Sequence, residues 1–203
     1  MLLICYDKHN KRIACGRYVE VFTVYFKKPG PRNTQATIDL ALQTARERGI
    51  KHIVVASTSG RTAMLLAHCH DLRVVCVTHV YGFSENGKNE MEEQVRLELQ
   101  QRGVHVLTTT HVLSGVERGI SAQSGGMYPA EIMSNTLRML GQGTKVCVEI
   151  AIMALDTGLI PHGDAVIAIG GTGAGADTAA IVTPAHAQHV FKTKLHEILC
   201  KPY

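Results

Sequence analysis

Short runs of β-branched and other apolar residues alternate along this chain with longer segments of helical periodicity. The apolar runs, each bounded by turn residues as buried strands are, lie at Val21 to Phe26, His52 to Ala56, Val74 to Thr78, Val104 to Thr108, Ala165 to Ile169 and Ala179 to Thr183. The segments with helical spacing are Thr34 to Arg48, Thr62 to His70, Glu90 to Arg102, Pro129 to Leu140 and Thr144 to Asp156. This alternation predicts an α/β fold with mainly parallel strands and helices on both faces of the sheet.

The last two predicted strands break the alternation, because the loop between them is too short for a helical crossover. The final strand should therefore run antiparallel to the strand before it. A chain of 203 residues is near the usual upper size of one domain. We predict a single domain over residues 1–203, with its core at about residues 50–185 and an N-terminal extension at residues 1–49.

Composition and charge narrow the class of partner. The chain is 45% hydrophobic and 19% charged, which is ordinary for a globular domain. Its formal charge of +4 is small and the basic residues are scattered, so we expect no nucleic-acid partner. The first apolar run is too short for a signal peptide or a membrane span, so we expect a cytoplasmic protein without a membrane partner.

Cysteine and histidine spacing argues against disulfide and metal chemistry. The six cysteines form no CxxC pair, and we expect free thiols. His68, Cys69 and His70 are metal-ligand residue types, but neighbouring helix positions point to different faces and do not converge on one ion. We therefore expect no metal site.

A turn of small polar residues follows the strand His52 to Ala56 and has the composition of a phosphate-binding loop. Its members are Ser57, Thr58, Ser59, Gly60, Arg61 and Thr62. Backbone N–H groups at a helix start lack partners inside the helix, Gly60 would let an anion approach them, and Arg61 could add a charge-assisted contact. In the alternative interpretation Ser59 or Thr62 only caps the helix and Arg61 is a surface charge.

A glycine-rich loop follows the strand Ala165 to Ile169. It contains Gly171, Thr172, Gly173, Ala174, Gly175 and Asp177. A strand follows where the dinucleotide fingerprint needs a helix, and the lysine of a Walker loop is missing, so we expect no ATP-driven chemistry. Such glycines indicate close backbone approach, either to a ligand or to another segment. Asp177 could accept from a ligand hydroxyl or fix the turn.

Two histidines follow the predicted second and third strands, so both should lie near the same edge of the sheet. His79 and His111 could act as general bases or as planar hydrogen-bonding partners, or they could simply be packed there. Tyr81, Gly82 and Phe83 follow His79 and could wall a flat ring, or serve as lid or core residues.

Longer stretches resemble known proteins. Ser57 to Ala63, followed by Val74 to Thr78, resembles the C-terminal regulatory domain of pyruvate kinase, and this resemblance covers about His52 to Thr183. Further stretches resemble a family of standalone, functionally uncharacterised archaeal and bacterial proteins; they are Tyr25 to Gly30, His111 to Arg118, Thr136 to Gly143 and Gly173 to Thr178.

The resemblance implies a fold and a site. The fold is a three-layer α/β/α domain with a mixed, mostly parallel five-stranded sheet in the order 32145, its last strand antiparallel. Both loops then leave the carboxyl ends of neighbouring strands where the strand order reverses, which is where open α/β sheets bind ligands. In pyruvate kinase the corresponding loops hold an effector sugar phosphate. The resemblance implies phosphate binding for Ser57 to Thr62 and, less specifically, for Gly171 to Asp177, without kinase activity because the catalytic barrel is absent.

The sequence leaves three functions open. Two of them bind a small phosphorylated molecule, and in the third the site is empty. The first is binding of flavin mononucleotide (FMN) or a similar nucleotide, with a flavin-dependent reaction if the protein is an enzyme, because a phosphate site beside an apolar crevice suits a phosphate tail plus a planar ring. The second is a non-enzymatic sensor of a sugar phosphate. The third is a structural interface module, and the sequence leaves a homo-oligomer open.

Overall fold

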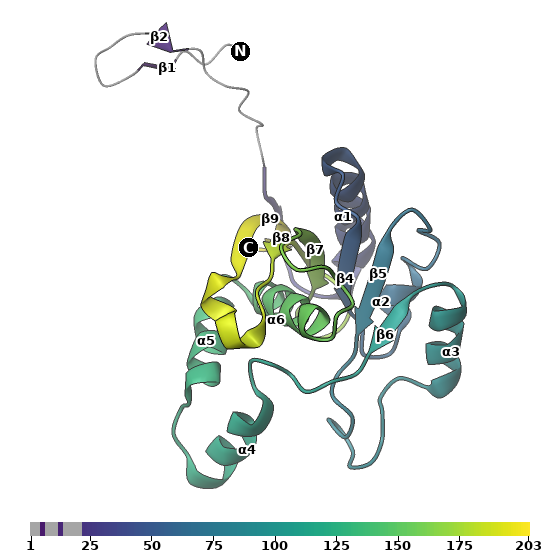
Figure 1. Ribbon diagram of the computed structural model, residues 1–203, viewed down its shortest axis with the longest axis vertical. Coiled ribbons are helices and arrows are strands. Elements are labelled where there is room, and N and C mark those ends of the chain that lie inside the picture. Colours follow the sequence, from purple (N-terminus) through teal and green to yellow (C-terminus); the bar gives the residue numbers. More distant parts are fainter. Residues whose placement is uncertain (1–4, 7–11, 14–21) are drawn as a thin grey trace.

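The computed structural model describes residues 5–6, 12–13 and 22–203 (Figure 1). Strands β1 (Cys5–Tyr6) and β2 (Arg12–Ile13) pair antiparallel with each other. The other strands form one seven-stranded sheet with the order β3-β9-β8-β7-β4-β5-β6. Their bounds are β3 (Val24–Phe26), β4 (His52–Ala56), β5 (Arg73–Val77), β6 (His105–Leu107), β7 (Val166–Gly170), β8 (Thr178–Thr183) and β9 (Lys194–Pro202).

The centre of this sheet has the predicted order and directions. Strand β4 pairs in parallel with β5 on one side and with β7 on the other, and β5 pairs in parallel with β6. Strand β8 pairs antiparallel with β7, as the short connection between them required. Counted along the chain, β6, β5, β4, β7 and β8 give the order 32145, and the predicted α/β fold class is confirmed.

The predicted count of five strands is wrong, because two more strands extend the sheet beyond β8. Strand β9 pairs antiparallel with β8, and β3 pairs in parallel with β9. Strand β9 escaped prediction because charged residues such as Lys194 and Glu197 interrupt its apolar pattern, as they can where a strand is only partly buried. The predicted strand at Val21 to Phe26 is reduced to Val24–Phe26, and Val21 lies outside the described residues.

The helices agree with the prediction where their apolar spacing is regular. They are α1 (Thr34–Arg48), α2 (Arg61–Met64), α3 (Glu93–Gln101), α4 (Gly115–Ser124), α5 (Pro129–Arg138) and α6 (Gln142–Asp156), with short 3₁₀ turns at Pro31–Asn33 and Ala187–Lys192. Helix α4 was not predicted. Helix α2 is much shorter than the predicted Thr62 to His70, because the chain tightens into bonds between residues three apart, such as Ala67 N–H to the Met64 carbonyl.

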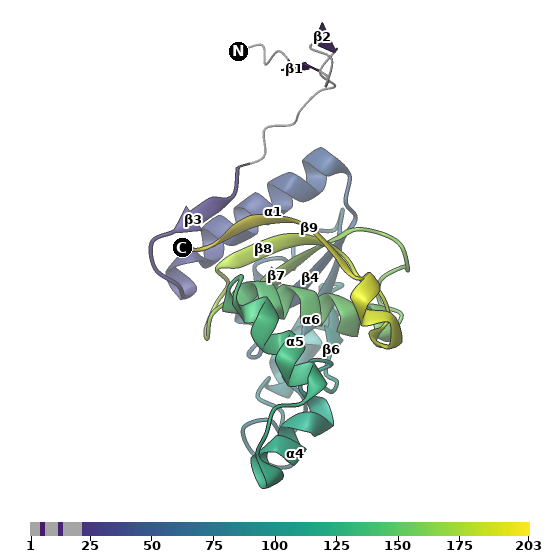
Figure 2. The same cartoon turned by 90° about the vertical axis from the view of Figure 1, so that its left-hand side faces the viewer.

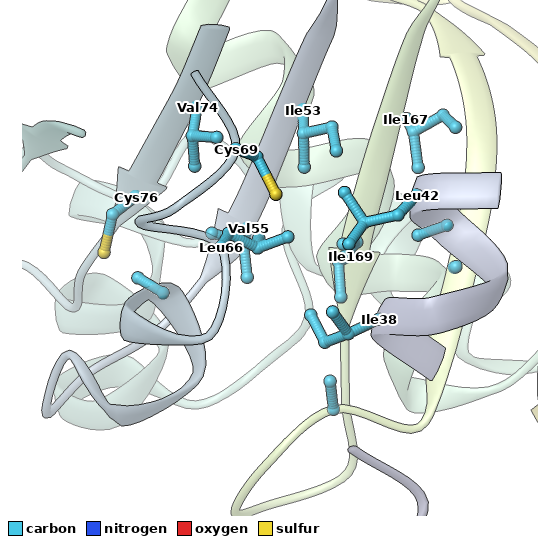
Figure 3. Close-up of a cluster of buried hydrophobic side chains, with 14 of the residues drawn as sticks. Ile38, Leu42, Ile53, Val55, Leu66, Cys69, Val74, Cys76, Ile167 and Ile169 are labelled. Carbon is cyan, nitrogen blue, oxygen red and sulfur yellow. The ribbon is translucent and has the colours of Figure 1, made fainter. Parts of the chain in front are cut away.

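Helices cover both faces of the sheet. Figure 2 shows α1 on one side and α6 on the other. Alternate residues of β4 therefore enter different cores: Ile53 and Val55 pack with Ile38 of α1 (Figure 3), whereas Val54 packs with residues of α6. This is the three-layer arrangement that the sequence predicted.

The part of the predicted N-terminal extension that forms β3 and α1 belongs to this architecture. Ile38, Ala41 and Ala45 of α1 are at most 1% exposed, and they lie in the same core as the central strands. Strand β3 adds the outermost member of the sheet beside β9. No helix among the residues that the structure describes is long and apolar enough to cross a membrane.

Candidate functional site

A cavity of about 1020 Å³ lies between the two loops singled out in the sequence. It opens beyond the carboxyl ends of β4 and β7, the neighbouring strands at which the strand order reverses. The structure brings most of the predicted site residues together there; those that line the cavity are Ser57, Thr58, Ser59, Arg61, Thr62, His79, His111, Gly171, Gly173, Ala174 and Gly175. Gly60, Thr172 and Asp177 belong to the loops but do not line the cavity.

In the first loop, Ser57 is bonded to the start of α2, whereas Arg61 and Ser59 are exposed. Ser57 is buried, and its Oγ accepts hydrogen bonds from the backbone N–H groups of Thr62 at 3.2 Å and Ala63 at 3.4 Å. The N-cap position of the four-residue helix α2 is Gly60, and Ser57, instead of Ser59 or Thr62, satisfies two N–H groups of the first turn that were expected to face an anion. The side chain of Arg61 is exposed and its Nε donates to Ser59 Oγ at 3.2 Å. The donors left for a ligand are mainly side chains.

Gly60 is explained by packing. Its φ of +83° lies in the left-handed region, and a Cβ at this position would meet Val95 Cγ1 of α3 at 2.5 Å. Gly60 therefore lets the loop lie against α3, and neither Gly60 nor Val95 lines the cavity.

The second loop is held from inside by Asp177, whose side chain is fully buried. Its carboxylate accepts from Gly30 N–H at 2.9 Å, Thr172 N–H at 3.2 Å and Thr178 Oγ1 at 2.9 Å. Of the two roles that the sequence left open, the structure shows Asp177 fixing the turn.

The glycines of this loop present backbone to the cavity and to the N-terminal segment. A Cβ on Gly175 would meet Pro31 Cα at 2.6 Å, and Ala176 N–H donates to Thr34 Oγ1 at 3.0 Å. Gly173, by contrast, has a φ of +78° and open space around the position of a Cβ. The loop is thus fastened on one side to residues 30–34 and leaves its tip at the cavity.

The two histidines form an aromatic group at the ends of β5 and β6. Their ring centroids are 5.5 Å apart, and Phe83 packs on His79 with a centroid distance of 4.1 Å. His79 Nδ1 lies 2.7 Å from Glu90 Oε2, and the hydroxyl of Ser84 donates to the other Glu90 oxygen. This carboxylate orients the His79 ring, as the partner of a general base does.

The electrostatics of this group favour a neutral His111. Burial lowers the pKa of His111, and repulsion from His79 and Lys145 lowers it further, against the attraction of Glu149. His111 Nε2 accepts the Val80 N–H at 3.3 Å, as a neutral ring can. Burial tends to raise the pKa of Glu90, but hydrogen bonds from Ser84 and His79 outweigh it, so the pKa of Glu90 is lowered and its carboxylate is charged at neutral pH.

An ion pair that the sequence analysis did not predict lies in the wall of this cavity. Lys145 and Glu149 lie one turn apart on α6, both line the cavity, and their side chains are 7% and 6% exposed. Lys145 Nζ donates to one oxygen of Glu149, and the other oxygen accepts the Leu113 N–H at 3.0 Å. The signal was present in the sequence as two opposite charges at a spacing of four inside an otherwise apolar helix.

His68, Cys69 and His70 do not line the cavity, and neither do the four described buried cysteines. Cys69 is buried while its neighbours His68 and His70 are exposed, so the three point apart. Within the described ranges, no three histidine, cysteine or acidic side chains are grouped so that they could hold a metal. Cys69, Cys76, Cys147 and Cys200 are free and buried.

A family model agrees with this fold. Residues 35–182 match the family model described as the alpha/beta domain of pyruvate kinase. Among solved structures, the chain is similar to a pyruvate kinase from Cryptosporidium parvum, with 20% sequence identity and a TM-score of 0.36 over 68% of this chain and 20% of that one. Since the family model covers well over half of the chain, the protein belongs to the family of the pyruvate kinase alpha/beta domain.

Proposed function

We propose that the cavity binds a phosphate-bearing small molecule and that the phosphate lies at the loop from Ser57 to Thr62. The observation that carries this proposal is the placement of Thr58, Ser59 and Arg61 on the wall of a 1020 Å³ cavity at the reversal point of the sheet. An exposed arginine beside two hydroxyls supplies charged and neutral donors to phosphate oxygens. These side chains, rather than the short helix α2, are the proposed phosphate contacts.

FMN is the ligand that we propose first. The cavity volume is at the upper end of the range for small-molecule sites, so a nucleotide-sized ligand fits. Apolar side chains such as Leu65 and Ile150, the ring of Phe83, and the glycine backbone of the second loop offer surfaces for a planar ring. If the protein is an enzyme, a flavin-dependent reaction is the activity that such a ligand would support.

A sugar phosphate is the second candidate, because part of the wall is polar. Glu131, Asn135 and Gln142 line the cavity and could bond the hydroxyls of a sugar. In that case the protein would act as a sensor without catalysing a reaction. A structural module with an empty site is the remaining alternative.

Two measurements on the purified protein separate these ligands. A yellow protein that releases flavin on denaturation supports FMN, and thermal melting with FMN or with a sugar bisphosphate tests both ligands on the colourless form. At about 100 times the dissociation constant, a ligand stabilises by about 2.7 kcal/mol, or roughly 5–10 °C for a chain of this size. If no phosphorylated compound raises the melting temperature, the proposal is wrong and the structural module is favoured.

A further inference from the structure

The ion pair of Lys145 and Glu149 is the most deeply buried charge in the cavity wall. The two residues are 6% and 5% exposed, and both reach the cavity from the same face of α6. Glu149 is held from behind, because one of its oxygens accepts the Leu113 N–H while the other accepts from Lys145 Nζ. The position of the ammonium group is thus fixed by a carboxylate that is itself fixed to the backbone.

The ammonium group has donors to spare. A protonated lysine carries three N–H donors. Within residues 22–203, Glu149 is the one hydrogen-bond partner of Lys145 Nζ. Two donors at the cavity wall are thus available to a ligand.

Stability alone does not account for this pair. Removing two charges from water costs about as much as their attraction returns, and apolar side chains of similar size usually serve a protein interior equally well. The neighbours of the pair on α6 are apolar: Cys147 and Ala151 pack in the core of the sheet, and Ile150 belongs to that core and also lines the cavity. A charged pair on the face of α6 that lines the cavity therefore points to a ligand.

We propose that Lys145, held by Glu149, is a second anchor of the ligand site, on α6 instead of on the first loop, and donates to carbonyl or oxyanion oxygens of the ligand other than those of its phosphate. This inference rests on the proposed function, which assigns the phosphate to Arg61 and its neighbours. It defines the ligand class as a phosphorylated molecule that also carries oxygen acceptors outside the phosphate. The ring of FMN has such oxygens, whereas orthophosphate offers only the first anchor.

The test uses three probes and two variants of the full chain. The probes are FMN, riboflavin, which has the ring without the phosphate, and orthophosphate. The first variant is Arg61→Ala. The second is the pair Lys145→Gln with Glu149→Gln, which removes both charges together, preserves side-chain size and keeps an acceptor for Leu113 N–H. Lys51→Gln, at an exposed position, is the control.

Loss of each anchor should weaken the binding of different probes. The glutamine pair should bind both FMN and riboflavin about 10–100-fold more weakly, the loss expected for a charge-assisted hydrogen bond, and should bind orthophosphate as the wild type does. Arg61→Ala should weaken FMN and orthophosphate and leave riboflavin unchanged. Lys51→Gln should change none of the three dissociation constants.

Each contrary result has one meaning. Wild-type affinity of the glutamine pair for FMN and riboflavin overturns the second anchor, and so does a loss confined to orthophosphate, which would place the phosphate at Lys145. Unchanged orthophosphate and FMN binding by Arg61→Ala overturns the proposed function instead. If the glutamine pair does not fold, Lys145→Met with Glu149→Met gives an apolar replacement. The methionine pair should lose affinity for the same probes. Wild-type affinity of the methionine pair for riboflavin would overturn the second anchor.

Discussion

The two loops line the cavity with different groups: the first with polar side chains, the second with glycine backbone. The loop from Ser57 to Thr62 turns its glycine toward α3 and its polar side chains toward the cavity. The loop from Gly170 to Asp177 turns its acidic side chain inward and its glycine backbone toward the cavity. The first loop thus contributes hydrogen-bonding and charged side chains, and the second contributes a backbone surface without side chains at its glycines.

The difference shows that loop composition does not reveal which side of a loop binds. Both loops contain glycine and a charged residue, yet Arg61 is exposed at the cavity whereas Asp177 is fully buried. The first loop depends on contacts with α3, and the second depends on residues 30–34. Variants that break one dependence at a time can test this division.

The largest effect is expected from removal of the segment that holds the second loop. Deletion of residues 1–48 removes β3, α1 and the hydrogen-bond partners of Asp177 and Ala176, and it uncovers one face of the sheet. We expect the truncated chain to be unfolded or insoluble. A protease-resistant, folded and soluble fragment that begins near His52 would show instead that the N-terminal segment is separable.

Asp177→Ala should destabilise the fold strongly, though less than the N-terminal deletion. The substitution leaves Gly30 N–H, Thr172 N–H and the Thr178 hydroxyl without their acceptor, and each unsatisfied buried group costs about 1–3 kcal/mol. The free energy of unfolding in urea should fall by about 3 kcal/mol or more. Asp39→Ala, at an exposed site on α1, should change it by less than about 0.5 kcal/mol. Equal effects of the two substitutions would contradict the internal role of Asp177.

Alanine at one glycine of each loop compares the two directly. Gly60 and Gly173 both have positive φ, which costs alanine about 1–2 kcal/mol. At Gly60 the new Cβ also meets Val95, so overpacking adds about 1–3 kcal/mol, whereas at Gly173 it meets open space. Urea unfolding should therefore show a greater loss for Gly60→Ala than for Gly173→Ala, and the reverse order would refute the packing role of Gly60.

The smallest effect is expected at the cysteines beneath the loops. Cys76 Sγ donates to the carbonyl of Ser57, and burial raises the pKa of Cys76 to about 12. Burial also raises the pKa of Cys147, which donates to the carbonyl of Ala168. In a Cys5→Ser, Cys15→Ser variant the remaining four thiols should react with a thiol reagent only after denaturation. Cys76→Ala should leave ligand affinity unchanged. A folded Cys76→Ala variant with reduced ligand affinity would contradict a purely structural role of Cys76.

The sequence was sufficient for those elements whose signal is local. Strand β4 and helix α1 were predicted to the residue, because regular apolar spacing and clear boundaries mark them. Helix α4 was missed because none of its residues is buried, so it shows no core-facing pattern. Strand β9 was missed because charges interrupt its apolar residues.

The same limit applies to the site. Both loops were found because each follows an apolar strand, and the strand order then places them together. The direction of Gly60 depends on Val95, and the role of Asp177 depends on Gly30, contacts between distant parts of the chain that no local pattern encodes. Lys145 and Glu149 were overlooked because a pair at this spacing is ordinary on a helix surface, and only the fold shows that it is buried at a cavity.

Phosphate binding by the first loop is tested most directly by titrating the wild-type protein and Arg61→Ala with FMN and riboflavin. The wild type should bind FMN far more tightly than riboflavin. Arg61→Ala should weaken FMN binding by roughly 10–100-fold, as expected for the loss of a charge-assisted hydrogen bond of about 1.5–3 kcal/mol, without changing the melting temperature. Equal affinity of the wild type for FMN and riboflavin would contradict the assignment of a phosphate to this loop.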